Sequence, residues 1–254
     1  FAQGIEQAVR SVEGCMISYV PNDPAGFPFQ HLLQRGVDGI VLIGIDVTHP
    51  TVEMLRSRGV PMVLINHKGT HGVSSVSVAH HAAMATLTSH LIETHGYRRF
   101  VYLQGGPVSY TGERLAGALE SVQEHGLGRD ALEIISYANG LDEAEQRIAA
   151  NLDNIDGVIV DRADYAVWLM RRLQRRGVRL PDDVAIVGFD DVALGMDTAP
   201  PLTTIAFDAP AIGERATQVL ISVIRGKIVD AHIELPFELK VRQSCGCRLA
   251  GHGR

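Results

Sequence analysis

Short apolar runs alternate along this chain with longer stretches in which apolar residues recur every three or four positions. The short runs are rich in β-branched side chains, which is typical of strands buried on both faces of a parallel sheet. The longer stretches are typical of helices packed on such a sheet, and several of them stop at a glycine. The pattern predicts strands at 15–20, 37–45, 60–65, 100–103, 134–137, 158–160 and 184–189, and helices at 1–12, 29–34, 79–94, 112–125 and 210–225.

Strand and helix alternate throughout, so the predicted fold class is α/β with parallel sheets. Including a strand-like stretch near the C-terminus, there are about eight strands, which would fill either one wide sheet or two smaller ones.

Polar side chains follow five of the apolar runs. The carboxyl ends of parallel strands line the crevice in which an α/β sheet binds its ligand. Polar loops explain most single cases, but they explain the mixture of amide, guanidinium and carboxylate less easily. We therefore predict a ligand crevice outlined by Asp46, Asn66, Gln104, Arg162 and Asp190.

Composition narrows the function classes. The chain has 254 residues, 46% of them hydrophobic and 20% charged, with a formal net charge of −6. It has no Lys/Arg block, so any contact with DNA would come from residues outside the chain. No apolar run approaches the roughly 20 residues that cross a bilayer. Three cysteines make no disulfide framework, which fits a cytoplasmic protein.

Several kinds of chemistry find little support in the sequence. Gly105-Gly106-Pro107 lacks the spacing of a dinucleotide or P-loop motif, and no G-x-S-x-G elbow occurs, so we expect no cofactor and no catalytic residue. Cys245-Gly-Cys247 is one close pair without a nearby histidine, so no metal site is expected, and the histidines between 67 and 95 are expected to be solvated. Asp190-Asp191 could hold Mg²⁺, which leaves an α/β enzyme as an alternative.

Two arginines suggest the nature of the ligand. Arg114 lies near the start of a predicted helix, where the dipole disfavours a cation, so an anionic or polyhydroxyl partner would explain it. A surface ion pair with Glu113 or Glu120 is an equally good explanation. Arg162 directly follows a buried strand. Two arginines and one or two carboxylates facing one crevice would suit a small ligand with hydroxyls and an acidic group.

The run PDDVAIVGFDD, followed by PPLTTI and LPFELKVRQSCG, closely resembles the end of the effector-binding domain of LacI/GalR-type transcription regulators. GVDGIVLIG, RGVPMVLIN, HLIETHGYRRFVYLQG and GERLAGALESVQEHG resemble its earlier segments in the right order. That family shares the periplasmic-binding-protein type I fold. The resemblance implies two Rossmann-like lobes, each a parallel sheet with helices on both faces, joined by three crossovers near Gln104–Gly105, Phe207–Asp208 and Ile233–Pro236. The N-terminal lobe would comprise 1–104 with 208–232, and the C-terminal lobe 105–207 with 233–254.

By matching motifs, the resemblance places Arg114 and Asp190 on the family's main ligand-contacting positions. Asn66 matches an acidic contact, and Tyr110 falls at another contact. We expect Arg114 and Asp190 to face a shared gap between two hinged lobes.

Three departures bear on the ligand. The family usually has Asn-Asp at Arg162-Ala163, Val-Asp-Asn at Val78-Ala79-His80, and often glutamine at Phe207. The added cation favours an acidic or phosphorylated carbohydrate over a neutral sugar. We predict that the ligand contacts are made by Arg114, Asp190, Asn66, Arg162, Tyr110 and Phe207.

The resemblance implies the effector-sensing domain of a dimeric, non-enzymatic repressor in the cytoplasm. In it, closure around a small effector would alter the dimer's grip on operator DNA through a helix-turn-helix headpiece absent from this chain. A periplasmic-type sugar-binding protein, a sensor domain of a signalling protein and the enzyme using Asp190 and Asp191 remain alternatives.

Overall fold

The computed structural model describes residues 1–16, 36–67, 72–106, 109–137, 140–227 and 231–247. It divides the chain into two compact units, each assembled from separate stretches of sequence. Unit 1 comprises Phe1–Val78 with Asp208–Leu235, and unit 2 comprises Ala79–Phe207 with Pro236–Arg254. The predicted strand at 15–20, beyond its first two residues, and the predicted helix at 29–34 lie outside the described residues.

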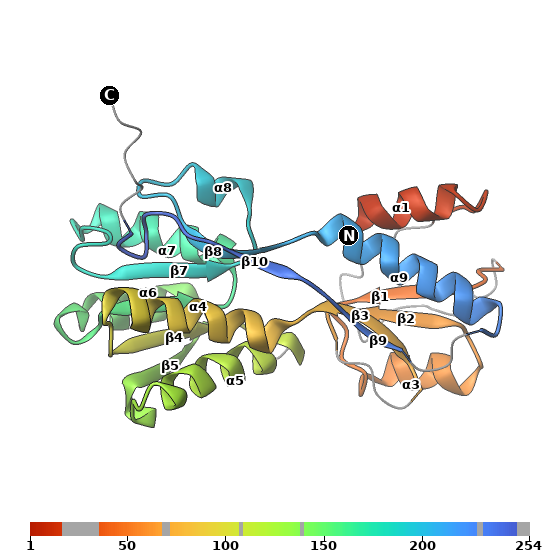
Figure 1. The fold of residues 1–254 in the computed structure, drawn as a ribbon, viewed down its shortest axis with the longest axis horizontal. Coiled ribbons are helices and arrows are strands. Elements are labelled where there is room, and N and C mark those ends of the chain that lie inside the picture. The colour runs from red at the N-terminus through yellow and green to blue at the C-terminus, as the bar shows by residue number, and fades with distance from the viewer. Residues whose placement is uncertain (17–35, 68–71, 107–108, 138–139, 228–230, 248–254) are drawn as a thin grey trace. The chain divides into compact units, whose positions relative to one another are not determined.

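In the residues that the structure describes, unit 1 is built on a four-stranded, all-parallel sheet in the order β1-β2-β3-β9 (Figure 1). Its strands are β1 (Ile40–Ile43), β2 (Met62–Ile65), β3 (Ser74–Val78) and β9 (His232–Leu235), and its helices are α1 (Ala2–Arg10), α3 (Pro50–Ser57) and α9 (Ala209–Ile224).

Two glycines let α1 and α9 pack with their backbones in contact. A Cβ on Gly4 would meet the carbonyl oxygen of Pro210 at 1.8 Å, and one on Gly213 would meet that of Phe1 at 2.2 Å. α9 in turn contacts β1, β2 and β3, so it covers the sheet while α1 lies against α9. Asp208 caps α9 by accepting a hydrogen bond from the amide of Ala211 at 2.8 Å, which suits a helix that starts Asp208-Ala209-Pro210.

The described part of unit 2 contains a six-stranded sheet in the order β10-β8-β7-β6-β4-β5, in which β10 runs antiparallel to β8 and the other pairs are parallel. Its strands are β4 (Phe100–Gln104), β5 (Leu132–Ser136), β6 (Gly157–Val160), β7 (Ala185–Phe189), β8 (Thr203–Phe207) and β10 (Phe237–Lys240). Its α-helices are α4 (His80–His95), α5 (Ser109–Glu124), α6 (Leu141–Ala149), α7 (Ala163–Arg175) and the short α8 (Ala193–Met196), with 3₁₀ turns η2 (Arg129–Ala131) and η3 (Leu152–Asn154).

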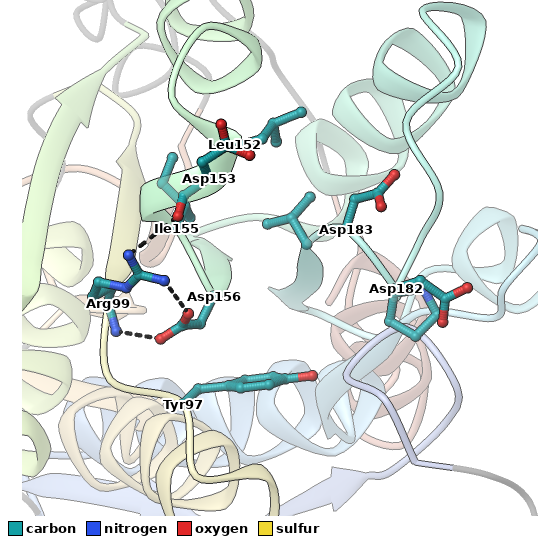
Figure 2. Close-up of a pocket in the computed structure, with 10 residues that line it drawn as sticks. Tyr97, Arg99, Leu152, Asp153, Ile155, Asp156, Asp182 and Asp183 are labelled. Atoms are coloured by element: carbon teal, nitrogen blue, oxygen red, sulfur yellow. Dashed lines mark hydrogen bonds and ion pairs between the residues drawn. The ribbon is translucent and has the colours of Figure 1, made fainter.

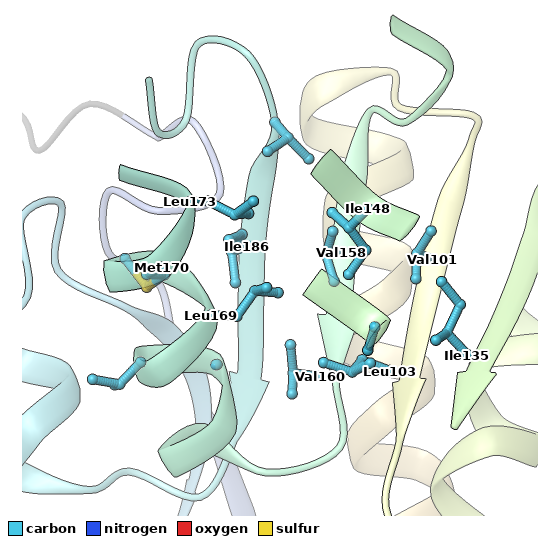
Figure 3. Close-up of a cluster of buried hydrophobic side chains, with 14 of the residues drawn as sticks. Val101, Leu103, Ile135, Ile148, Val158, Val160, Leu169, Met170, Leu173 and Ile186 are labelled. Atoms are coloured by element: carbon cyan, nitrogen blue, oxygen red, sulfur yellow. The ribbon is translucent and has the colours of Figure 1, made fainter. Parts of the chain in front are cut away.

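The core of unit 2 explains why its strands are nearly continuous apolar runs. Alternate residues of the strands pack against the buried faces of α6 and α7, and the same strands present their remaining residues to the opposite face (Figure 3). Removing these apolar side chains from water stabilises the unit. The strand residues of this cluster are Val101, Leu103, Ile135, Val158, Val160 and Ile186.

The α/β class with parallel sheets is confirmed, and the strands form two separate sheets. The chain passes between the units at Val78–Ala79, Phe207–Asp208 and Leu235–Pro236. The first passage differs from the predicted one at Gln104–Gly105, because β4 pairs with β5 and β6 in the sheet of unit 2 and α4 packs on α5. None of the helices in the described part of the chain is long and apolar enough to cross a bilayer.

Candidate functional site

The guanidinium of Arg114, on α5, is the centre of a polar network at the carboxyl edge of the unit 2 sheet. The residue is only 1% exposed. Its Nη1 donates to the backbone carbonyl of Asp161, its Nε donates to Nδ1 of His80 at 3.2 Å, and its Nη2 lies 3.5 Å from Oδ1 of Asp190. Asp161 and Asp190 directly follow β6 and β7, so two neighbouring strand ends place a backbone carbonyl and a carboxylate beside one cation. The alternative of a surface ion pair with Glu113 or Glu120 is wrong, since Arg114 is buried and Glu120 faces His81 at 3.3 Å.

Aromatic rings enclose the same guanidinium. Its Cζ lies 3.5 Å from the centroid of the Phe189 ring and 4.7 Å from that of Tyr110. The His80 ring stacks on Tyr110 with centroids 5.3 Å apart. A cation placed over ring faces in a desolvated setting gains on the order of 2 kcal/mol, which offsets part of the cost of burying the charge.

Asp161 is held by the backbone and by a tyrosine. Its Oδ2 accepts from the amide of Gly105 at 2.7 Å, and its Oδ1 accepts from the hydroxyl of Tyr137 at 2.5 Å. A Cβ on Gly105 would lie 2.7 Å from that hydroxyl, so only glycine fits there. Burial raises the pKa of Asp161, while these two hydrogen bonds and Arg114 act in the opposite direction. Asp161 therefore serves as a buried anchor that fixes its own carbonyl for Arg114.

Asp190 is the member of the network that reaches solvent. Its backbone has φ 83°, a left-handed conformation that non-glycine residues seldom adopt, and 33% of its side chain is exposed. Burial raises the pKa of Asp190, and the charges of Arg114 and Arg162 oppose the rise. The strained backbone turns the carboxylate back over the strand end, where it can accept hydrogen bonds from a ligand.

His80 opens α4 and is only 1% exposed, so the expectation that the histidines of this region are solvated is wrong for it. Burial first, and then the charge of Arg114, lowers the pKa of His80 to about 2. The ring is thus neutral, and because Nδ1 accepts from Arg114, the proton lies on Nε2. His80 is a fixed acceptor for the buried arginine.

Arg162 and Phe207 lie at the margin of this network. The Arg162 guanidinium is 42% exposed, donates to both carboxylate oxygens of Asp164, and lies 4.8 Å from the centroid of Tyr165. Phe207 ends β8 with its ring 6.1 Å from the ring of Phe189.

Unit 2 thus brings together five of the six predicted contacts, Arg114, Asp190, Tyr110, Arg162 and Phe207. The sixth, Asn66, is buried at the end of β2 in unit 1, with φ 59°. Arg114 and Asp190 are neighbours within one unit, rather than residues of two halves that face each other. Three further members of the network, His80, Tyr137 and Asp161, were missed; Asp161 carried a signal, because it follows an apolar run just as Asp190 does.

The two adjacent acids after β7 do not share a site. Asp191 pairs with the guanidinium of Arg242, with Oδ1 and Oδ2 at 2.7 and 3.0 Å from Nη2. Asp190 faces Arg114 instead. Each carboxylate has its own arginine, so the geometric basis for a joint Mg²⁺ site is absent at this pair.

A hollow of about 390 Å³ lies at the opposite, amino ends of the unit 2 strands (Figure 2). Tyr97 and Arg99 line it on one side and Asp182 and Asp183 on the other. Asp156 in this hollow accepts from the amides of residues 98 and 99 and from the Arg99 guanidinium, which are local structural bonds. Ligands of open α/β sheets bind at the carboxyl ends, so we assign the candidate site to the Arg114 network.

The expectation that no histidine lies near Cys245-Gly-Cys247 is wrong. His90 and His95 of α4 lie beside the two cysteines, and the four ligand atoms are within 4.8 Å of one another. The C-terminal segment is held against α4 in part by the Tyr97 hydroxyl, which donates to the Cys245 carbonyl at 3.2 Å.

Comparison with known proteins shows the family. The sequence model of the Periplasmic binding protein-like domain matches residues 88–245. The chain is 30% identical over 213 residues to the HTH-type transcriptional regulator GntR of Pseudomonas aeruginosa, which covers 81% of this chain but 62% of the relative. It is 32% identical over 279 residues to the HTH-type transcriptional regulator reg1 of Streptomyces lividans, covering 100% of this chain and 78% of the relative.

Solved structures show the same fold. A transcriptional regulator CelR–cellobiose complex superposes with a TM-score of 0.86 at 24% identity, covering 96% of this chain and 77% of that one. A LacI family regulator from Enterococcus faecium with bound ribose superposes with a TM-score of 0.82 at 21% identity, covering 96% of this chain and 91% of that one.

Proposed function

This chain belongs to the LacI/GalR family of transcriptional regulators, and we propose that it is an effector-sensing domain that binds a carbohydrate at the Arg114 network. The proposal depends on one observation above all. Asp190, held by a buried arginine and turned by a left-handed backbone, presents a partly exposed carboxylate at the carboxyl edge of the sheet. A carboxylate fixed in this way accepts two hydrogen bonds from adjacent sugar hydroxyls without reorganising.

The neighbouring aromatic residues support a sugar ring as the ligand. Tyr110 and Phe207 are half-buried, so each can offer a ring face to the apolar face of a sugar. The buried Arg114 acts chiefly by holding Asp190 in its ionised, oriented state. One relative is named a ribose operon repressor, and two similar structures hold cellobiose and ribose, which is consistent with this ligand class.

The position of Arg162 bears on whether the ligand carries an acidic group. Its guanidinium is exposed and already paired with Asp164, so an acidic group on the ligand would have to replace that partner. Exchange of one carboxylate for another on a bidentate arginine costs little, whereas a neutral sugar would leave the pair intact. We propose that Arg162 selects sugar acids or sugar phosphates over neutral sugars.

We further propose that the complete protein is a homodimeric repressor in which effector binding changes affinity for operator DNA. The chain spans 62% of the length of the GntR relative, and that relative is named as an HTH-type regulator, which supports a separate DNA-binding headpiece. The coupling would require that the effector bind one arrangement of the two units more tightly than the other.

The test is ligand binding by calorimetry after a thermal-shift screen of neutral sugars, sugar acids and sugar phosphates. Loss of one charge-assisted acceptor costs about 2 kcal/mol, so Asp190→Asn should weaken the best ligand by roughly 30-fold. Asp197→Asn, at the exposed end of α8, is the matched control and should change nothing. Unchanged binding by Asp190→Asn would refute the site.

Arg162→Ala separates the two ligand classes. It should weaken a sugar acid by about 10-fold and leave a neutral sugar unaffected, while Arg129→Ala on η2 should affect neither. Equal effects of Arg162→Ala on both ligand classes would contradict the proposed selection.

A further inference from the structure

Four side chains with metal-binding atoms converge at the C-terminal end of α4. His90 and His95 come from that helix, and Cys245 and Cys247 come from the segment that follows β10. We propose that these four residues bind one zinc ion, at a site separate from the Arg114 network and independent of the carbohydrate proposal.

Two of the distances between the ligand atoms are already those of a tetrahedral zinc site. With Zn–S of about 2.3 Å and Zn–N of about 2.05 Å, a tetrahedral ion holds sulfur and nitrogen roughly 3.5 Å apart. Sγ of Cys247 lies 3.4 Å from Nε2 of His95 and 3.7 Å from Nε2 of His90. The largest separation, 4.8 Å, exceeds the ideal by an amount that side-chain rotation can close.

The second ring nitrogen of His90 is already hydrogen-bonded. Its Nδ1 lies 3.2 Å from the hydroxyl of Thr94, one turn along α4, so a proton on Nδ1 leaves the Nε2 lone pair directed at the cysteines. Fixing the tautomer through the outer nitrogen is the usual arrangement for a histidine ligand. His95 is oriented by stacking on Tyr97, with ring centroids 5.1 Å apart and planes 21° apart.

The backbone between the two cysteines is shaped for this arrangement. Gly246 has φ 104°, and a Cβ there would meet the Tyr97 hydroxyl at 2.9 Å and Nδ1 of His95 at 3.2 Å. Only glycine therefore allows Cys245 and Cys247 to approach the histidines together. Sγ of Cys245 is fully buried and accepts from the Thr203 hydroxyl at 3.1 Å, a contact that also stabilises a thiolate.

The ligand set identifies the metal class and its role. Two sulfurs and two imidazoles in a tetrahedral arrangement favour Zn²⁺, and four protein ligands leave no open position for substrate, so the ion would be structural. It would join α4 to the C-terminal segment across 150 or more residues of sequence, and its binding would release the thiol protons to solvent.

The experiment uses the full chain, purified without metal-affinity resin and kept under a thiol-free reductant. We expect one zinc per chain by elemental analysis, and after removal of zinc, Co²⁺ should give the visible bands of a tetrahedral site with thiolate-to-cobalt charge transfer. Removal of the zinc should lower the unfolding midpoint by several degrees, and added Zn²⁺ should restore it.

Two variants separate this site from adventitious binding. Cys247→Ser should weaken Zn²⁺ binding by about 100-fold or more. Losing a residue that only hydrogen-bonds a metal ligand already costs about 10- to 100-fold, and losing the ligand itself should cost more. Cys15→Ser, an exposed cysteine in unit 1, and His81→Gln, an exposed histidine of α4, are matched controls and should retain one zinc.

Three results would overturn the proposal. The first is that the reduced chain takes up neither zinc nor cobalt. The second is that Cys247→Ser retains as much zinc as the wild type. The third is that Cys245 and Cys247 form a disulfide whether or not metal has been added. Should Cys247→Ser fail to fold, the cobalt spectrum of the wild-type chain still decides the question.

Discussion

His80 makes the stability of this protein depend on pH in a way that one substitution should remove. Its ring is buried, accepts from Nε of Arg114 and has a pKa of about 2, whereas the same side chain in the unfolded chain titrates near 6.5. Below that value the unfolded state binds a proton that the folded state does not. The free energy of unfolding must therefore fall as the pH falls, and it is recovered above neutrality.

The magnitude follows from the two pKa values. Between pH 7 and pH 5 the folded ring stays neutral, while the unfolded ring goes from mostly neutral to almost fully charged. Where the unfolded state binds one proton more than the folded state, the free energy of unfolding falls by about 1.4 kcal/mol per pH unit. Summed from pH 7 to pH 5, the loss of stability is about 2 kcal/mol. Because pH 5 lies far above the folded pKa of about 2, the folded ring binds no proton anywhere in this interval.

His80→Asn is the informative substitution, since its amide oxygen can accept from Arg114 but does not titrate. We expect urea unfolding to show that the wild type loses about 2 kcal/mol more than this variant between pH 7 and pH 5. Asp161 and Asp190, whose pKa values are raised by burial, act in the opposite direction, because the folded state binds their protons more tightly than the unfolded state does. They are common to both proteins and cancel in the difference. Identical pH dependence of the two proteins would refute a buried neutral His80.

Two further predictions concern the stability of unit 2. Arg114→Met should lower the free energy of unfolding at pH 7 by about 3 kcal/mol, which is the lower end for a broken buried pair because Asp190 can be rehydrated. Urea titration measures this loss, and the control Arg162→Ala should stay within about 0.5 kcal/mol of wild type. Gly117→Ala should cost about 1–3 kcal/mol, because its Cβ would lie 2.1 Å from the His81 carbonyl oxygen where α5 crosses α4. Gly112→Ala on the same helix meets nothing within 4 Å and should be neutral or stabilising, so equal losses in the two glycine variants would contradict the close crossing.

The alternation of apolar runs and amphipathic stretches predicted the fold class because each strand is buried on both faces and each helix on one. The five strand-end polar residues were predicted to outline one crevice, but they divide between the sheets. Gln104, Arg162 and Asp190 belong to unit 2, whereas Asp46 and Asn66 belong to unit 1. The first passage between units could not be located, since α4 and β4 carry the same periodicity whichever sheet they join. Only strand pairing decides it, and β4 pairs with β6 across more than 50 residues of sequence.

Side-chain clusters assembled from distant segments were harder to predict. His90 and His95 are five residues apart, which is outside the i, i+4 spacing that marks a helical metal site. Cys247 lies 157 residues beyond His90 and 152 beyond His95. His80 was equally hidden, because a histidine at a helix start is polar by composition and its burial depends on Arg114, Tyr110 and Phe189. Such groupings follow from tertiary packing rather than from local pattern.

The interleaving of the two units along the chain has a consequence for biosynthesis. Residues 40–78 supply β1, β2 and β3, yet α9, which covers this sheet, and β9 are translated only after residue 208. Meanwhile residues 79–207 already contain five of the six strands of the other sheet. Nascent unit 1 therefore keeps one apolar face of its sheet uncovered while most strands of unit 2 are already being made, and this face is exposed to aggregation until α9 is complete.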